Sequence, residues 1–171
     1  MTPFRLLFVA MIATVLLIGA RSGAEAQFPR GLLAEPPRDS RTAECAIETR
    51  PLSFGNFDPE ANADLDAVAQ VIYTCNNQAK KLRIDMSQGT SNSYDRSMSN
   101  GGYSLDYNIY VDPTHRTVWG DGVLGTDVYY QNNPPNGTPV VVLAYGRIPG
   151  RQTQPLPSGQ YVDTVTVRVL F

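Results

Sequence analysis

The clearest pattern in the chain is an alternation of apolar and polar residues with a period of two. Three segments show this alternation, residues 81–87, 105–111 and 165–171. Successive side chains of a β-strand point to opposite faces, so this period predicts strands that are buried on one face. Segments 68–75 and 140–145 are more continuously apolar, which is typical of central strands in a sheet.

Turn-forming residues separate these segments. Gly, Pro, Asn and Asp cluster at 100–102, 120–122, 132–137 and 155–159. Several strands separated by such turns indicate an all-β antiparallel sandwich. The sequence of the predicted domain has no sustained helical period, although residues 62–69 are compatible with one short helical turn. The polar stretch 87–102 predicts a long surface loop.

The first 26 residues are typical of a secretory signal peptide. Arg5 precedes an apolar run at residues 6–20, and Ala24-Glu25-Ala26 has the small-residue form of a cleavage site. The run has 15 residues, whereas a membrane helix needs about 20. We expect cleavage after Ala26 and no membrane span in the mature chain. A retained N-terminal anchor is the alternative.

Residues 27–43 are poorly suited to a folded core. They contain Pro29, Pro36 and Pro37 and few bulky apolar side chains. This composition predicts an extended N-terminal arm. The folded part is therefore expected to be one domain, residues 44–171.

The charge balance excludes one class of partner. The full chain has 14 Lys and Arg residues against 16 Asp and Glu residues. The expected leader contains Arg5, Arg21 and Glu25, which leaves 12 basic and 15 acidic side chains in the mature chain. Without a basic surplus to attract phosphate groups, we expect no binding to nucleic acid.

The chain has two cysteines, Cys45 and Cys75. In an exported protein, an isolated pair is expected to form one disulfide bond. Two reactive thiols would need a neighbouring histidine or a C-x-x-C spacing, and the sequence has neither.

The sequence contains no recognisable catalytic constellation. The single histidine, His115, follows Asp112 by three residues in a Pro-containing turn. A metal site needs three or four ligands, so a solvated histidine is expected. Asp64 and Asp66 likewise predict a solvated polar surface. We therefore expect neither an enzyme nor a bound metal or cofactor.

The last predicted strand has an apolar face that could lie at an uncovered edge of the sandwich. Val165, Val167, Val169 and Phe171 share one face of segment 165–171, and the given sequence ends there. An ordinary sandwich can end on a strand, which is the simpler interpretation. However, an apolar strand at an uncovered edge promotes aggregation. A strand added by another chain protects such an edge.

Several short motifs occur in a fixed order along the predicted domain. They include Phe54-Gly55-Asn56-Phe57-Asp58-Pro59, Arg96-Ser97-Met98, Trp119-Gly120-Asp121-Gly122, Tyr145-Gly146-Arg147 and Tyr161-Val162-Asp163. Together with a signal peptide and one cysteine pair, this order resembles the spore coat protein U (SCPU) domain family. That family includes the Csu-type pilins of archaic chaperone–usher systems. The resemblance runs from about residue 44 to residue 171.

The resemblance implies a fold, a set of partners and a groove. Members of the family are similar to incomplete immunoglobulin-like sandwiches that lack their last strand. A periplasmic chaperone lends a strand during export, and the N-terminal extension of a neighbouring pilin subunit replaces it after passage through an outer-membrane usher. The resemblance thus implies a structural subunit of a secreted pilus or surface coat. In this chain, Val165, Val167, Val169 and Phe171 would meet the donor strand.

One departure from the family pattern concerns the arm. A polymerising subunit needs an alternating apolar segment before its first cysteine, but this arm is interrupted by prolines. Because proline cannot donate a hydrogen bond to a strand ladder, the arm predicts a poor donor. The chain could then occupy a tip or an end of a fibre.

This departure leaves a second function class open, a terminal adhesin-like module that binds a surface or a carbohydrate. Its candidate recognition residues are Trp119, Tyr129 and Tyr130. The alternative for Trp119 is a place in the core or in a packed turn. For Asp163, which shares the parity of Val165, we expect a hydrogen bond to a turn backbone rather than catalysis.

Overall fold

The computed structural model describes residues 42–76 and 78–171. The expected signal peptide, residues 1–26, and nearly all of the expected arm lie outside these residues. Within the described part, nine strands and one short 3₁₀-helix occur. No helix in this part is long and apolar enough to span a membrane.

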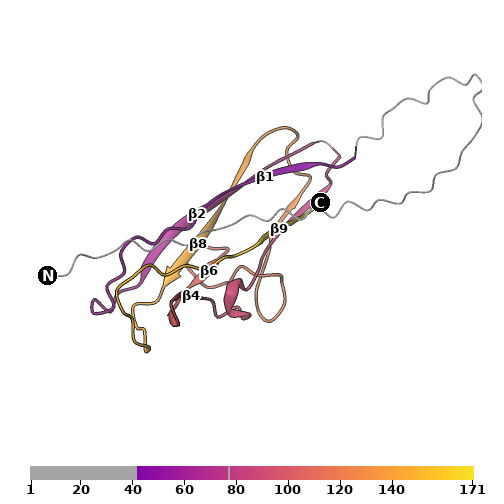
Figure 1. Ribbon diagram of the computed structural model, residues 1–171. Coiled ribbons are helices and arrows are strands. Elements are labelled where there is room, and N and C mark those ends of the chain that lie inside the picture. Colours follow the sequence, from indigo (N-terminus) through magenta and orange to yellow (C-terminus); the bar gives the residue numbers. More distant parts are fainter. Residues whose placement is uncertain (1–41, 77) are drawn as a thin grey trace, which may run out of the picture.

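The strands form two antiparallel sheets and a hairpin (Figure 1). The larger sheet has the order β1 (Cys45–Arg50), β2 (Leu65–Cys75), β8 (Val140–Ile148) and β6 (Asn108–Tyr110). The smaller sheet has the order β7 (Tyr129–Asn132), β3 (Lys81–Met86) and β9 (Val167–Leu170). The hairpin consists of β4 (Ser97–Asn100) and β5 (Tyr103–Asp106), and the 3₁₀-helix η1 spans Gly89–Ser91.

The core lies between the inner faces of the two sheets. Val71 and Tyr73 of β2 and Leu82 and Ile84 of β3 are all 0% exposed. Alternate residues of these strands face outward, as a half-buried sheet requires. The expectation of an all-β protein with two antiparallel sheets is therefore confirmed, as is the central place of β2 and β8.

Three expectations about local structure are wrong. Residues 62–69 form no helical turn, because β2 already begins at Leu65 and pairs with β8. Segment 105–111 is not one strand: its chain leaves β5 and enters β6 at Tyr107, whose amide donates to the carbonyl of Arg96 at 2.9 Å. Segment 87–102 is no simple surface loop, because it contains η1 and β4 and buries Arg96.

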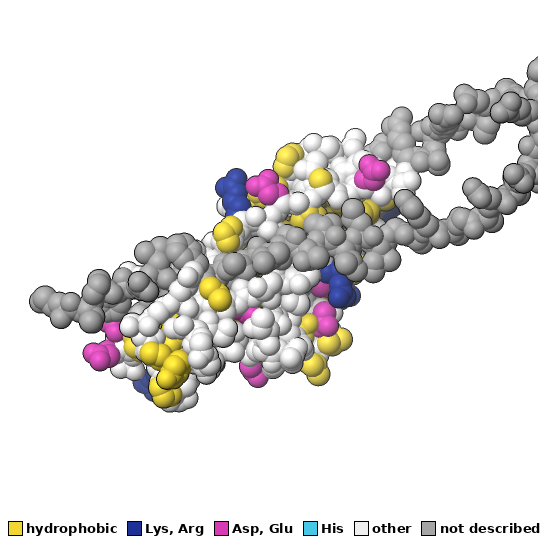
Figure 2. All heavy atoms as spheres, in the orientation of Figure 1, with side chains coloured by type: hydrophobic (Ala, Val, Ile, Leu, Met, Phe, Trp, Pro, Cys, Tyr) yellow, Lys and Arg dark blue, Asp and Glu magenta, His cyan; other side chains and the backbone are white. Residues whose placement is uncertain are grey.

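Charged side chains are scattered over the visible face of the molecule rather than gathered (Figure 2). On the face shown in Figure 2, acidic and basic side chains are interspersed, and neither sign forms a patch. This face therefore presents no basic surface for a phosphate backbone.

The disulfide bond joins the edge strand β1 to its neighbour. Cys45 and Cys75 lie directly opposite each other in the β1–β2 register, with a sulfur–sulfur distance of 2.08 Å. The expected disulfide is thus present. It fixes the start of β1 against the end of β2.

Replacing both cysteines by alanine is expected to destabilise the domain. The sequence separation of 30 residues corresponds to about 3 to 4 kcal/mol in the chain-entropy account of cross-linking. Urea unfolding of the oxidised protein and of the double variant measures this difference. A loss below about 1 kcal/mol would contradict the prediction.

Candidate functional site

One side of the sandwich is closed by residues 118–121, which we call the Trp119 segment. The Trp119 amide donates to the carbonyl of Ile109 in β6 at 2.8 Å, and the Met86 amide of β3 donates to the carbonyl of Gly120 at 2.9 Å. The Trp119 indole Nε1 donates to the carbonyl of Ile84 at 2.9 Å. This segment therefore connects β6 of the larger sheet to β3 of the smaller sheet.

The opposite side of the sandwich is bounded by two edge strands, β1 and β9. Cys45 lies opposite Cys75, the chain then enters β3 at Lys81, and Leu170 of β9 pairs with Arg83. The start of β1 and the end of β9 consequently lie at the same end of the molecule, and the two strands run in opposite directions (Figure 1).

The outer edge of β9 presents backbone groups without a strand partner among the described residues. The Ser87 amide donates to the Thr166 carbonyl at 2.9 Å, which makes these two residues a hydrogen-bonded pair. Pairs alternate along an antiparallel ladder, so Val167 and Val169 are non-hydrogen-bonded partners of Met86 and Ile84. The amides and carbonyls of Val167 and Val169 therefore point away from β3.

The apolar face of the last segment becomes more exposed toward the end of β9. Val165 is 0% exposed and Val167 is 3% exposed, whereas Phe171 is 43% exposed. Val169 lies between these extremes, and Ile47 on β1 is also only partly buried. We call the side-chain face of Val165, Val167, Val169 and Phe171, the expected donor-strand site, the β9 groove. Val165 and Val167 are already buried, so its accessible part is Val169 and Phe171 near the start of β1.

This arrangement can bind an extended peptide. A strand placed beside β9 would pair with the outward backbone groups of Val167 and Val169, and its alternate side chains would cover the exposed parts of Val169 and Phe171. The geometry provides main-chain hydrogen bonds and apolar contacts, which are the two components of strand addition.

A buried carboxylate anchors the segment that leads into β9. Asp163 is 2% exposed. Its Oδ1 accepts hydrogen bonds from the Thr90 amide at 2.9 Å and the Thr90 hydroxyl at 2.7 Å, and its Oδ2 accepts one from the Tyr107 hydroxyl at 2.7 Å. The expectation that Asp163 bonds to a turn backbone is confirmed, because Thr90 belongs to η1.

A buried arginine completes this anchor from the other side. Arg96 is 1% exposed, and its guanidinium donates to the carbonyls of Ser87 and Trp119 and to Oδ1 of Asn108. Four hydrogen bonds of 2.6 to 3.0 Å satisfy this charge without a direct ion pair. Arg96 therefore holds the end of β3, the Trp119 segment and β6 together.

Burial sets the protonation of this network. Burial, followed by the adjacent Asp163 carboxylate, raises the pKa of Tyr107, so its hydroxyl stays protonated and donates. Burial lowers the pKa of Arg96, while Tyr107, Tyr94 and Asp163 act in the opposite direction.

Arg96 belongs to the Arg96-Ser97-Met98 motif, but the sequence alone assigned it no role. The sequence does contain a signal for its burial. Arg96 lies two residues before Met98 and so points to the same face of an extended chain, and Met98 is 0% exposed. A charged residue on the buried face of a strand predicts a satisfied polar network rather than a solvated side chain.

The expected recognition residues do not form one surface. Trp119 is 0% exposed, so the surface-recognition role considered for it is wrong; its indole is held inside by the bond to Ile84. The Tyr129 ring is half-buried, 6.4 Å from the Trp119 ring and 6.2 Å from the Tyr73 ring. Tyr130 alone of the three is largely exposed, at 47%.

The expectation of a solvated histidine is also wrong. The His115 side chain is 8% exposed, with its ring 5.2 Å from that of Tyr110 and 6.5 Å from that of Tyr145. Its Nε2 lies 3.8 Å from Oδ1 of Asp66. The two tyrosine rings cover it on the outer face of the larger sheet. In the described part of the chain, no three potential metal ligands come together.

Comparisons with known proteins agree with this architecture. A family model described as the Spore Coat Protein U domain matches residues 37–168. Among curated proteins, no sequence matches the chain.

A solved structure of similar fold is a chain in the crystal structure of the CsuC–CsuE chaperone–tip adhesion subunit pre-assembly complex, from archaic chaperone–usher Csu pili of Acinetobacter baumannii. The TM-score is 0.55 at 21% sequence identity. The match covers 76% of this chain and 40% of that chain, so this chain spans less than half the length of the matched one. The family match confirms the expected family, which is a structural rather than an enzyme family, and the solved structure shows a similar fold.

The anchor around Asp163 generates a prediction about stability. Replacing Asp163 by alanine leaves the buried hydroxyl of Tyr107 and the amide of Thr90 without their acceptor, which is expected to cost about 2 to 4 kcal/mol. The matched control is Asp95→Ala, because Asp95 is exposed and its loss is expected to change stability by less than about 0.5 kcal/mol. Urea unfolding distinguishes the two variants. Equal stability of both would show that the anchor is not needed.

Proposed function

Since the chain belongs to the Spore Coat Protein U domain family, we propose that it is a structural subunit of a secreted pilus or surface coat. Its sandwich is completed by a strand from another protein, and that strand lies in the β9 groove. The sandwich is immunoglobulin-like and lacks its last strand until the donor binds. The protein thus acts by binding, without chemistry.

The observation that carries this proposal is the unpaired outer edge of β9. The backbone groups of Val167 and Val169 point away from β3, and no described strand accepts them. The same segment exposes Phe171 at the open end of the groove. A donor strand satisfies both the polar edge and the apolar face at once.

The partners follow from the same reasoning. A periplasmic chaperone supplies the donor strand before assembly, an outer-membrane usher receives the complex, and a neighbouring pilin subunit supplies the strand in the fibre. A chaperone and a tip subunit share the similar crystal structure, which supports the first step. The route leads through the periplasm to the cell surface, where adhesion and biofilm formation are the expected uses.

A single charge in the β9 groove tests the proposal. Val169→Asp places a carboxylate on the apolar face, which the donor strand can cover only at a large desolvation cost. When the mature chain is co-expressed in the periplasm with the chaperone of its assembly system, we expect the recovered complex to fall by about tenfold or more, which corresponds to at least 1.4 kcal/mol.

The matched control for this experiment is Val141→Asp. Val141 lies on β8 and is 51% exposed on the outer face of the larger sheet, so the same substitution there leaves the complex intact. Wild-type recovery of the complex with Val169→Asp would contradict the proposal. A wild-type chain that never binds the chaperone would contradict it as well.

The arm favours an end position in the fibre. Pro29, Pro36 and Pro37 remove three backbone donors from residues 27–43, so the arm is a weak strand donor. The chain then accepts a strand but does not elongate a fibre, as an adhesin-like tip would. The preparation described above also tests this point: a one-to-one chaperone complex supports an end position, and a ladder of SDS-resistant oligomers contradicts it.

A further inference from the structure

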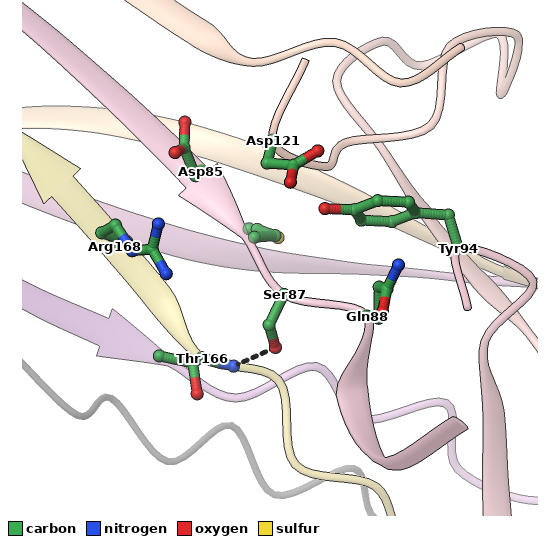
Figure 3. A pocket seen from close by; sticks show the side chains of 8 residues that line it. Asp85, Ser87, Gln88, Tyr94, Asp121, Thr166 and Arg168 are labelled. Atoms are coloured by element: carbon green, nitrogen blue, oxygen red, sulfur yellow. Dashed lines mark hydrogen bonds between the residues drawn. The ribbon is translucent and has the colours of Figure 1, made fainter. Parts of the chain in front are cut away.

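A small polar cavity lies outside the β9 groove, where the end of β3 meets the start of β9. It has a volume of about 240 Å³. Figure 3 shows the side chains around its opening, with the Tyr94 hydroxyl directed toward Asp121. The lining comes from the end of β3 and the link to η1, from the loop after η1, from the Trp119 segment and from the start of β9 with the residue before it: Asp85, Met86, Ser87, Gln88, Tyr94, Asp121, Thr166 and Arg168.

Part of this lining is held rigidly by internal contacts. The Arg83 Nε donates to Oδ1 of Asp85 at 2.6 Å, and the Thr166 amide donates to the Ser87 hydroxyl oxygen at 2.9 Å. The hydroxyl of Tyr94 bonds to Asp121, and burial together with this bond raises the pKa of Tyr94 to about 12. The walls of the cavity are therefore fixed before any ligand arrives.

Other polar groups of the lining are available. Among the described residues, none engages the side chains of Gln88, Thr166 or Arg168. Gln88 and Thr166 can both donate and accept hydrogen bonds, whereas Arg168 only donates. Arg168 faces Asp85 in the strand register, yet Asp85 is bound to Arg83 instead.

These groups select one class of ligand. The carboxylates of Asp85 and Asp121 would repel an anionic ligand. A metal ion is not favoured either, because no three potential metal ligands come together among the described residues. Arg168 and the adjacent Arg83 balance the two carboxylates, so the cavity is nearly neutral and suits an uncharged ligand. Hydroxyl groups fit best, because each can donate to a carboxylate and accept from Arg168 or Gln88.

The size of the cavity restricts the ligand further. Drug-sized ligands occupy pockets of about 300 to 1,000 Å³, and this cavity, at about 240 Å³, is smaller. It accommodates one ring with several hydroxyls, while Met86 and the Tyr94 ring provide apolar contact. We propose that the cavity binds one sugar residue of a neutral carbohydrate.

This site differs in place from the recognition surface expected from the sequence and goes beyond the proposed function. Trp119 has no part in the lining, and the ligand contacts come from Gln88, Thr166 and Arg168. The sugar site lies beside the backbone of β9, and its free side chains point away from the β9 groove. Sugar binding can therefore be present or absent independently of strand addition.

Saturation-transfer NMR on the purified mature chain, alone or in its chaperone complex, tests the proposal. The probes are methyl glycosides of glucose, galactose, mannose and N-acetylglucosamine, with glycerol and inorganic phosphate as non-sugar ligands. We expect saturable binding of at least one glycoside with a Kd on the order of 1 mM. Glycerol and phosphate are expected to show none.

Two variants and one control locate the binding. Arg168→Ala and Gln88→Ala are each expected to weaken glycoside binding by about tenfold or more. Arg151→Ala is the control, because Arg151 is exposed and lies outside the lining. The proposal is overturned if no glycoside binds, if phosphate binds in place of the glycosides, or if both cavity variants bind as tightly as the control.

Discussion

The outer edge of β9 imposes the main constraint on this protein. The amides and carbonyls of Val167 and Val169 point away from β3, while their side chains face the core between the sheets. Backbone groups beside an apolar surface need hydrogen-bond partners. No described residue provides a strand there. The opposite side of the sandwich is closed by the Trp119 segment, so the two sides of the molecule are unequal.

The polar network of Arg96 and Asp163 explains how this edge stays in place. An edge strand with only one neighbour gains little from its own ladder. Here the segment before β9 is fixed by the buried carboxylate of Asp163, and the end of β3 is fixed by the buried guanidinium of Arg96. The strand that would receive the donor is thus held at its Val165 end and exposed at its Phe171 end. Because only the Val165 end is anchored, the apolar side chains become more exposed from Val165 toward Phe171.

Strong alternation predicted β3 and β9 correctly, but segment 105–111 alternates as clearly and is divided between β5 and β6. Strands whose pattern is weak were missed. β3 and β9 were found because bulky apolar residues alternate with polar or charged ones. β1 escaped because, in Cys45–Arg50, only Ile47 is a large apolar residue on the inner face. The sequence left Trp119 open between a recognition surface and the core, since Gly and Asp follow it as in an exposed turn. Contacts between segments far apart in sequence, such as Thr90 with Asp163, carry no local signal.

Hydrogen exchange at the β9 edge tests the central claim most directly. The amides of Val167 and Val169 are measured in the isolated chain and in the assembled complex, with the buried β2 residue Val71 as the internal reference. The account predicts fast exchange of both amides in the isolated chain, strong protection in the complex, and slow exchange of Val71 in both states. Strong protection of Val167 and Val169 in an isolated, monomeric chain would contradict it, because the chain would then cover its own edge.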